Sequence, residues 1–493
     1  MHLATQLKEV ETRPVTAQAR HGGALLRLLT CGSVDDGKST LIGRLLWDAA
    51  GVTEDQRAAV MHASQNRAVN GEKIDFSLLL DGLQAEREQG ITIDIAWRYF
   101  ETSDRRFIII DSPGHEQYTR NMATGASHAD IAILLVDARH GAKRQTRRHA
   151  AICDLVGIKK VVLAVNKMDA VDWSEARYRE IEREFLGMAG SFTFAQVTII
   201  PVAALTGDNV VYRSVAMPWY AGPTLLDYLE SVDPEAVQHD APFRMPVQLV
   251  LRASGDFRGY AGTITSGRIR IGERIVDARS GLGATLRRIS TMDGDLTSAG
   301  KGDAVTLVLD TDLDISRGAV LSEVPRRPVN ADVIEARLVW LSETPFDPEA
   351  GYLLRTATDL TPVTSMSVSA LVDFETLAST PAHACGVNDI ADCRILLGRA
   401  AAIDLFRDLA LTGNFVLVSA IDGATVAGGV ITWAQAGAPQ VGDNVLVLNR
   451  ELLARGVCAD LGDSPADNAE FHRRAQEVAA LLRSVGVPVL VEL

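Results

Sequence analysis

The sequence predicts an α/β domain built on a parallel sheet, followed by two small β-barrels and a short α/β tail. From residue 25 to about 238, apolar strands alternate with helical stretches, the pattern of a sheet with helices on both faces. Beyond Asp233-Pro234 the chain changes to short strands with frequent glycines, which favours barrels. We divide the chain into an N-terminal arm (1–24), the α/β domain (25–238), a first barrel (239–329), a second barrel (330–434) and a tail (435–493).

Apolar runs of strand length define the elements of the α/β domain. Five such runs are Leu25–Cys31, Phe107–Asp111, Ile131–Val136, Val161–Val165 and Val197–Val202. Helical stretches are predicted over Thr40–Leu46 and Trp173–Gly187. Because ligands of such sheets bind beyond the carboxyl ends of the strands, functional side chains should follow these runs.

Glycines and prolines mark the remaining domains. The segment Phe257–Ile269 alternates short apolar runs with glycines, as a small barrel does. The second β-rich block, Asn330–Trp433, lies between Pro325–Pro328 and Gly437–Pro439. The tail returns to a helix-and-strand pattern and ends in the apolar run Val485–Val491.

Composition bounds the class of protein. At 493 residues the chain is too long for one hydrophobic core, and its 47% hydrophobic and 23% charged residues are typical of a soluble globular enzyme. The net charge of −14 argues against a surface built to hold RNA or DNA. The sequence contains no run of about 18 apolar residues, the length that a membrane-spanning helix needs. We therefore expect no nucleic-acid or membrane partner, a cytoplasmic location, and five reduced, structural cysteines.

The segment Gly32–Ser39 fits the phosphate-binding pattern GxxxxGK[ST] between a predicted strand and a predicted helix. Its backbone N–H groups and the helix N-terminus would face phosphate oxygens, Lys38 would reach the terminal phosphates, and the Ser39 hydroxyl would ligate Mg²⁺. The sequence thus predicts a nucleoside triphosphate site. Its residues are Gly32, Ser33, Val34, Asp35, Asp36, Gly37, Lys38, Ser39 and Thr40.

Three further motifs follow in the order that a guanine-nucleotide switch requires. Asp111 ends a predicted strand and is expected to hold Mg²⁺ through a water, while the Gly114 N–H meets the γ-phosphate. In the segment Asn166–Asp169, the Asp169 carboxylate can accept two neighbouring N–H donors that guanine presents and adenine lacks. Thr92 is placed to close over Mg²⁺ when the γ-phosphate is present. Alone each motif is weak, but together they predict GTP and Mg²⁺ as ligands.

The chain resembles the translation-factor superfamily of GTPases over residues 25 to about 434. Within that superfamily it is similar to the large, GTP-hydrolysing subunits of bacterial sulfate adenylyltransferase. The resemblance rests on three segments, Gly32–Leu46, Asp81–Asp94 and Asp111–Ser127. Elongation factors usually lack the run Asp81–Gln84, which supports the narrower assignment.

The resemblance implies a P-loop GTPase domain with two β-barrels and a separate small subunit. That partner would join ATP to sulfate, releasing pyrophosphate and adenylyl sulfate, and GTP hydrolysis on this chain would drive the reaction. By the same resemblance His115 orients the attacking water, while Val34 and Ile91 form an apolar gate. An imidazole suits this role because one nitrogen can bind water while the protein holds the other. The alternative is that His115 only caps a turn.

Some residues depart from the family pattern. The last guanine-contacting element usually begins with serine, but here it reads Ala203, Ala204 and Leu205. The Ala204 N–H can still meet the guanine carbonyl, whereas the missing hydroxyl removes a hydrogen bond worth about 0.5–1.5 kcal/mol, so we expect weaker nucleotide binding. In the second barrel, Arg355–Thr358 and Ala400–Asp404 also differ from the usual sequence.

The tail is similar to the middle of adenylyl-sulfate kinase, on the evidence of Asp460–Arg474 and the residues up to Val491. No second phosphate-binding loop occurs after residue 39, and the kinase's substrate-binding positions fall on Asp463, Asn468 and Phe471. We therefore expect no kinase activity. The alternative is an unrelated helix-strand appendage.

Two other functions remain open from the sequence. One is a translation factor carrying a charged RNA, against which the acidic composition and Asp81–Gln84 count. The other is a GTP-binding scaffold without turnover, which Ala203 and the incomplete tail favour. Lys38, Thr92 and His115 instead favour an active GTPase.

Overall fold

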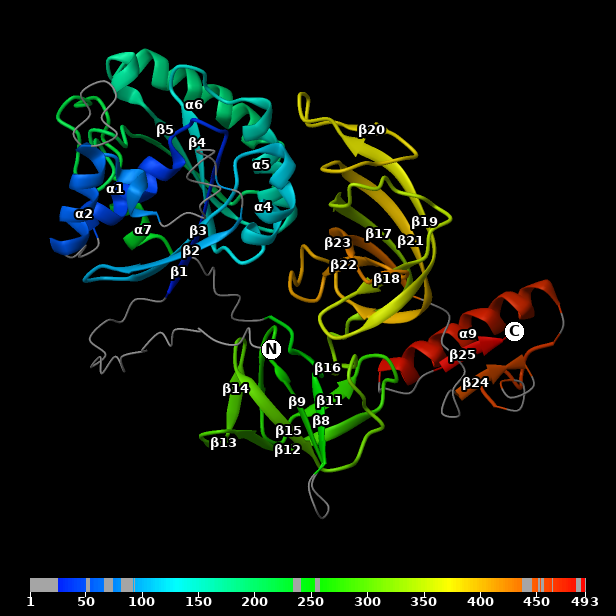
Figure 1. Ribbon diagram of the computed structural model, residues 1–493. Helices are drawn as coiled ribbons and strands as arrows, with labels where there is room; N and C mark the ends of the chain where they lie inside the picture. Colours follow the sequence, from blue (N-terminus) through cyan, green and yellow to red (C-terminus); the bar gives the residue numbers. More distant parts are fainter. Residues whose placement is uncertain are drawn as a thin grey trace, which may run out of the picture.

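The computed structural model describes residues 25–49, 54–65, 74–80, 92, 94–233, 241–252, 258–436, 446–450, 453, 456–462, 464–484 and 489–492 (Figure 1). The predicted N-terminal arm (1–24), the segment Asp81–Gly90 and Ile91 lie outside the described residues. No described helix has the length and apolar character that a bilayer span needs.

A six-stranded sheet forms the α/β domain, with strand order β2-β3-β1-β4-β5-β6. The strands are β1 (Leu26–Gly32), β2 (Ala96–Glu101), β3 (Arg106–Asp111), β4 (Ile131–Asp137), β5 (Lys160–Asn166) and β6 (Gln196–Pro201). Pairing is parallel from β3 to β6, and β1 lies between β3 and β4. This order brings the residues that follow β1, β3, β4, β5 and β6 to one edge of the sheet.

The predicted parallel sheet has one antiparallel strand at its edge, which we did not expect. β2 runs antiparallel to β3, with Ala96 opposite Asp111 and Glu101 opposite Arg106. We did not predict this strand because most of its side chains alternate between half-buried and exposed, so no continuous apolar run marks it. As an edge strand it leaves the order of the remaining strands unchanged.

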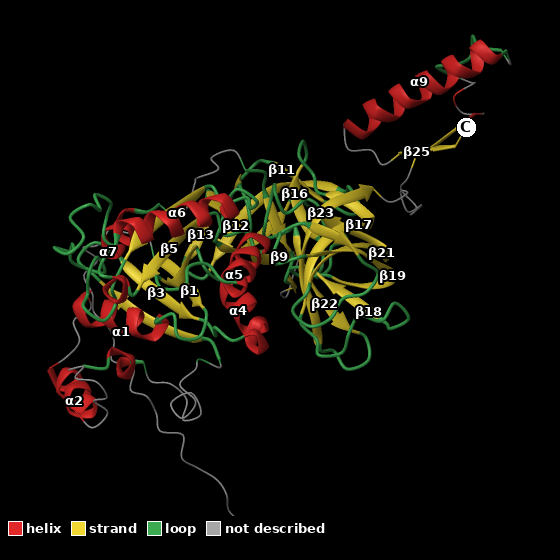
Figure 2. Cartoon of the chain, turned by 90° about the horizontal axis from the view of Figure 1, so that it is seen from above, coloured by secondary structure: helices red, strands yellow, loops and turns green. Residues whose placement is uncertain are grey.

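Helices lie on both faces of the sheet (Figure 2). They are α1 (Lys38–Ala49), α2 (Glu54–Gln65), α4 (Thr119–Ala126), α5 (Arg144–Leu155), α6 (Glu175–Ala189) and α7 (Leu225–Ser231), with short 3₁₀ turns η1 (Phe76–Leu79), η2 (Glu116–Tyr118) and η3 (Met168–Val171). The sheet shares one buried apolar cluster with α1, α4, α5, α6 and α7. All five cysteines are free and buried, as predicted.

The first barrel closes through one extended segment that carries two strands. β7 (Arg244–Pro246) pairs with β16 (Val320–Glu323), and β8 (Leu249–Arg252) pairs with β9 (Arg258–Thr263). The path between them runs through β11 (Arg274–Asp277), β12 (Gly283–Thr291) and β15 (Ala304–Leu309), with short strands β10 (Arg268–Arg270), β13 (Gly294–Leu296) and β14 (Ser298–Gly300) beside it. Because β7 and β8 follow each other directly, the sheet returns to its starting segment.

The second barrel is a ring of six strands in the order β18-β22-β23-β17-β21-β19, closed by pairing of β18 with β19. Their bounds are β17 (Val329–Trp340), β18 (Tyr352–Arg355), β19 (Leu360–Val372), β21 (Ile390–Ile403), β22 (Asn414–Ser419) and β23 (Thr425–Ala436), and β20 (Ser379–Pro381) adds to β19. The predicted fold class, an α/β P-loop domain followed by barrels, is confirmed.

The tail contains two parallel strands, β24 (Leu446–Asn449) and β25 (Val489–Glu492), and the helix α9 (Pro465–Ser484). Phe471 is buried in the apolar core of this unit, and the Arg450 guanidinium lies 4.9 Å from its ring centroid. Asn468 Oδ1 accepts a hydrogen bond from Arg450 at 2.6 Å. Two of the three positions aligned with kinase substrate contacts thus have structural partners, and Asp463 lies outside the described residues.

The second barrel packs against the α/β domain (Figure 1). Its residues Val339, Phe374, Ile390 and Val430 belong to the same buried cluster as the central sheet. The Arg148 guanidinium on α5 lies 4.8 Å from the Phe374 ring centroid. The second barrel therefore contacts the α/β domain through α5 and through a shared apolar core.

Candidate functional site

The predicted phosphate-binding loop connects β1 to α1, so Lys38 stands at the first turn of the helix. Gly37 has a φ of +88°, and a Cβ there would lie 2.5 Å from Asn166 Nδ2. A Cβ on Gly114 would lie 2.3 Å from the Gly32 carbonyl oxygen. Both positions need glycine because the loops around the site approach each other closely.

The loop surrounds a cavity of about 170 Å³. Its lining residues are Ser33, Val34, Asp35, Gly37, Lys38, Ser39, Thr40, Thr92 and Gly114. All nine belong to the nucleotide site predicted from the sequence, although they come from three separate segments. Val34 is 38% exposed.

Lys38 joins the residues predicted to hold the phosphates and Mg²⁺. Its Nζ lies 3.2 Å from Thr92 Oγ1 and 3.6 Å from Asp111 Oδ1. Asp111 is buried, and its Oδ1 lies 3.4 Å from Thr30 Oγ1. Ser39 also lines the cavity. The set offers hydroxyl and carboxylate oxygens, the ligands that Mg²⁺ prefers, beside a lysine suited to phosphate.

His115 directly follows Gly114, which lines the cavity, but His115 is not itself a lining residue. Its Nδ1 accepts a hydrogen bond from the Gln117 N–H at 3.3 Å and so caps η2. The ring is half-buried. The turn-capping contact considered as an alternative is therefore present, and the gate partner Ile91 lies outside the described residues.

Asn166 bridges the phosphate-binding loop and the last guanine element. Its buried side chain donates from Nδ2 to the Asp36 carbonyl at 2.8 Å. The Ala204 N–H, which we predicted to meet the guanine carbonyl, donates to Asn166 Oδ1 at 3.0 Å. Ala203 is buried beside it and Leu205 is 37% exposed. The contact of the Ala204 N–H with the guanine carbonyl stays a prediction.

Asp208 stabilises the loop in which alanine replaces the usual serine. Its carboxylate accepts hydrogen bonds from Thr206 Oγ1 at 2.5 Å, Ser214 Oγ at 2.5 Å and Trp173 Nε1 at 3.3 Å. The Gly207 N–H also donates to the Ala203 carbonyl at 2.7 Å. Hydrogen bonds other than that of the missing serine hydroxyl therefore hold this loop, and the weaker nucleotide binding stays a prediction.

Lys167 adopts a left-handed conformation with a φ of +60°. Its ammonium donates to the Asp35 carbonyl oxygen and lies 3.1 Å from Asp137 Oδ2. Asp169, the predicted guanine reader, lies two residues further on in η3 and is half-buried. The segment Asn166–Asp169 is therefore attached to the phosphate-binding loop at both of its first two residues.

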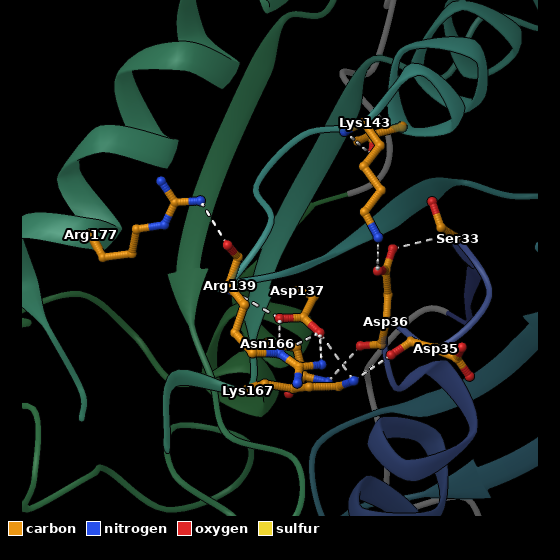
Figure 3. A network of polar contacts seen from close by, with 10 residues as sticks. Ser33, Asp35, Asp36, Asp137, Arg139, Lys143, Asn166, Lys167 and Arg177 are labelled. Atoms are coloured by element: carbon orange, nitrogen blue, oxygen red, sulfur yellow. Dashed lines mark hydrogen bonds and ion pairs between the residues drawn. The ribbon is translucent and has the colours of Figure 1, made fainter. Parts of the chain in front are cut away.

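Sequence reasoning missed three residues of the site, Asp137, Arg139 and Lys143 (Figure 3). Asp137 ends β4 and Lys143 precedes α5. Lys143 Nζ lies 3.7 Å from Asp36 Oδ1, while Asp36 Oδ2 accepts the Ser33 N–H at 2.8 Å. One signal was available, since an acidic residue at the carboxyl end of an apolar strand lies at the ligand-binding edge of the sheet and is a functional candidate.

The two acids respond differently to their surroundings. Burial raises the pKa of Asp36, although the Ser33 N–H and Lys143 oppose that effect. Burial also acts to raise the pKa of Asp137, but hydrogen bonds from Arg139 and Lys167 outweigh it and hold that pKa well below its usual range. Asp137 is therefore a firmly ionised carboxylate with two cationic partners.

His149 on α5 makes the stability of this domain depend on pH. Burial, with the charges of Lys38 and Arg148, lowers its pKa to about 3. The folded chain therefore holds a neutral imidazole while the unfolded chain takes up a proton below about pH 6.5, so stability falls as pH falls from there toward 3. From pH 6.5 to 5, we expect wild type to lose about 2 kcal/mol relative to His149→Gln.

Urea unfolding of the two proteins at both pH values measures this difference. A matched variant at His383, which is exposed on the second barrel, should follow wild type at both pH values. A gap between wild type and His149→Gln that stays constant with pH would contradict the assignment.

Comparison with known proteins identifies the family. Residues 24–235 match the elongation factor Tu GTP binding domain, and residues 333–432 match the GTP-eEF1A C-terminal domain-like family. Sulfate adenylyltransferase subunit 1 of Colwellia psychrerythraea is 47% identical, over 83% of this chain and 88% of its own. The chain belongs to the sulfate adenylyltransferase subunit 1 family. The Chromobacterium violaceum subunit 1 is 48% identical, over 83% of this chain and 86% of its own.

A further relative aligns with a larger share of this chain than these two subunit 1 proteins do. The bifunctional enzyme NodQ of Rhizobium tropici is 42% identical, over 95% of this chain and 81% of its own. A solved structure of sup35 complexed with GMPPNP covers 84% of this chain and 95% of its own at 26% identity, with a low TM-score of 0.38. The subunit 1 relatives confirm the family that the motifs predicted. The absence of kinase activity in the tail stays a prediction.

Proposed function

We propose that this subunit 1 homologue hydrolyses GTP in the cavity between β1, β3 and α1. Hydrolysis would drive the formation of adenylyl sulfate and pyrophosphate from ATP and sulfate on a separate small subunit. The observation that carries the proposal is the convergence of Lys38, Thr92 and Asp111, whose polar atoms lie within 3.6 Å of Lys38 Nζ. This set suits a γ-phosphate with its metal ion.

Each part of the site has a role in phosphoryl transfer. The N–H groups of the phosphate-binding loop and Lys38 would hold the phosphates. The oxygens of Ser39, Thr92 and Asp111 would hold Mg²⁺, which when bound neutralises charge on the β- and γ-phosphates. Asp169 would accept the two adjacent N–H donors of guanine and so exclude ATP from this cavity.

His115 would orient the water that attacks the γ-phosphate. Its Nδ1 is held by the Gln117 N–H, which leaves Nε2 to bind a water. Val34, exposed at the cavity, and Ile91 would restrict the approach of that water until the partner permits hydrolysis. Such restriction is what coupling requires, because free hydrolysis would waste the energy of GTP.

The turn after His115 offers a route by which the barrels can sense the site. Glu116 accepts a hydrogen bond on its carbonyl from Asn388 Nδ2 at 3.0 Å. Its carboxylate lies 2.6 Å from Arg148 Nη1, and Arg148 also packs over Phe374 of the second barrel. A partner that moves the barrel would therefore shift the turn that carries His115.

GTP hydrolysis by the purified chain tests the proposal, alone and with the candidate small subunit, with and without ATP and sulfate. We expect hydrolysis to rise only when partner, ATP and sulfate are all present, with adenylyl sulfate formed. A hydrolysis rate that does not change when the partner, ATP and sulfate are added would overturn the proposed coupling. Tight GTP binding with no hydrolysis under any condition would favour the scaffold alternative. The capping contact of His115 is consistent with that alternative, because it gives His115 a structural role.

A further inference from the structure

The loop from β4 to α5 is linked to the phosphate-binding loop at both of its ends, through Lys167 at one end and directly at the other (Figure 3). At its start, Asp137 Oδ2 lies 3.1 Å from Lys167 Nζ, which donates to the Asp35 carbonyl. At its end, Lys143 lies 3.7 Å from the carboxylate of Asp36. Two consecutive residues of the phosphate-binding loop, 35 and 36, are thus held by opposite ends of one short segment.

Asp137 is the centre of this arrangement. Its side chain is 2% exposed and receives hydrogen bonds from Arg139 Nη2 at 2.6 Å and Nε at 3.0 Å. The same oxygen, Oδ2, contacts both Arg139 Nη2 and Lys167 Nζ, so one carboxylate holds two cations side by side. Without that carboxylate the two positive charges would repel each other.

The backbone at Arg139 is held by Arg177 of α6. Arg177 Nε on α6 donates to the Ala138 carbonyl at 2.7 Å, and Arg177 Nη2 donates to the Arg139 carbonyl at 3.4 Å. Arg177 on α6 therefore holds the backbone from which the Arg139 guanidinium reaches Asp137. A rigid fork of this kind orders its carboxylate partner more strongly than a lysine does.

We propose that Asp137, Arg139 and Lys143 form a clasp that sets the nucleotide-binding arrangement of residues 35–36 and Lys167. Asp137 is a positioning residue that acts through Lys167, and it touches neither the reacting phosphate nor the attacking water. The inference rests on the proposed function, because the loops that it orders are those assigned to GTP. It goes further by giving a nucleotide-binding role to residues outside the recognised motifs.

The clasp predicts an effect on affinity and none on the chemical step. A preorganised site binds GTP and GDP equally well on the base side, so loss of the clasp should weaken both by the same factor. Hydrogen bonds to charged groups of this kind correspond to an affinity loss of about ten- to a hundredfold. The rate of hydrolysis at saturating GTP should stay close to wild type.

Asp137→Asn is the variant that isolates the charge. Asp137 also accepts the Arg139 N–H at 2.9 Å in a local turn, and asparagine preserves that turn. We expect weaker binding of both nucleotides, measured by calorimetry on the full chain, with an unchanged turnover number at saturation in the partner complex. Arg139→Lys keeps the charge but loses the fork, so it should show a smaller loss.

A double-mutant cycle with Lys167→Met tests whether Asp137 acts through Lys167. If it does, Asp137→Asn should have no further effect in the Lys167→Met background. The matched control is Asp154→Asn on α5, since the Asp154 carboxylate accepts hydrogen bonds from the Thr193 hydroxyl and N–H and lies outside the clasp. This control should bind GTP and GDP as wild type does.

The outcomes separate this inference from the proposed function. If wild type binds no guanine nucleotide, the proposed function fails. If wild type binds GTP but Asp137→Asn binds it equally well, or the two substitutions have independent effects, the clasp alone is wrong. Unchanged thermal unfolding temperatures would show that reduced affinity does not come from a partly unfolded sample, and an unfolded Asp137→Asn leaves Arg139→Lys as the deciding variant.

Discussion

His115→Ala is expected to lower GTP hydrolysis by about a hundred- to ten-thousandfold, the range for a positioned group that handles a proton or water in the transition state. GTP affinity should stay close to wild type, because His115 is not among the residues lining the cavity. The measurement is single-turnover hydrolysis in the presence of partner, ATP and sulfate, together with GTP binding by calorimetry.

His115→Asn separates the two roles considered for this residue. Asparagine can accept the Gln117 N–H that caps η2, as His115 Nδ1 does, but it places no imidazole nitrogen toward a water. If His115 orients the water, His115→Asn should be as slow as His115→Ala. If it only caps the turn, His115→Asn should hydrolyse GTP like wild type, and the catalytic role would be wrong. His383→Ala on the second barrel is the control.

Arg244→Ala is expected to destabilise the protein by about 3–5 kcal/mol, the cost of breaking a buried ion pair on one side. Arg244 begins β7 of the first barrel, and Asp404 follows β21 of the second. Two hydrogen bonds of 2.9 Å join them, and Thr412 Oγ1 adds a third contact to Asp404 at 2.7 Å. Both charged residues are buried, so Arg244→Ala leaves an uncompensated carboxylate between the barrels.

The earliest urea-unfolding transition of the full chain measures this effect. The exposed pair Arg288–Asp295, with an Nε to Oδ2 distance of 2.7 Å, provides the control, because Arg288→Ala should cost less than about 1 kcal/mol. Replacing Arg244 and Asp404 together by leucine should destabilise less than Arg244→Ala, since no charge is left buried. Equal effects of Arg244→Ala and Arg288→Ala would show that the pair does not hold the barrels together.

The residues of the proposed phosphate-binding site could be named from the sequence because they lie in short contiguous motifs. Lys38 and Thr92 are far apart in the chain, yet each is recognisable from its immediate neighbours, and the cavity brings them together. β2 escaped prediction because its side chains alternate in exposure without an apolar run. Asp404 fell in a stretch that departs from the family, and its role became clear only once Arg244 lay opposite it.

By itself the sequence determined the order of the domains, the family and the residues expected to hold GTP. These features depend on strand-length apolar runs and on local motifs, which carry their chemistry in a few neighbouring residues. Only the tertiary structure decided that Asp137 holds Lys167 and that Lys143 reaches Asp36. Such contacts depend on which strand ends become neighbours in the sheet, and the distance between two charged groups then sets the strength of their attraction.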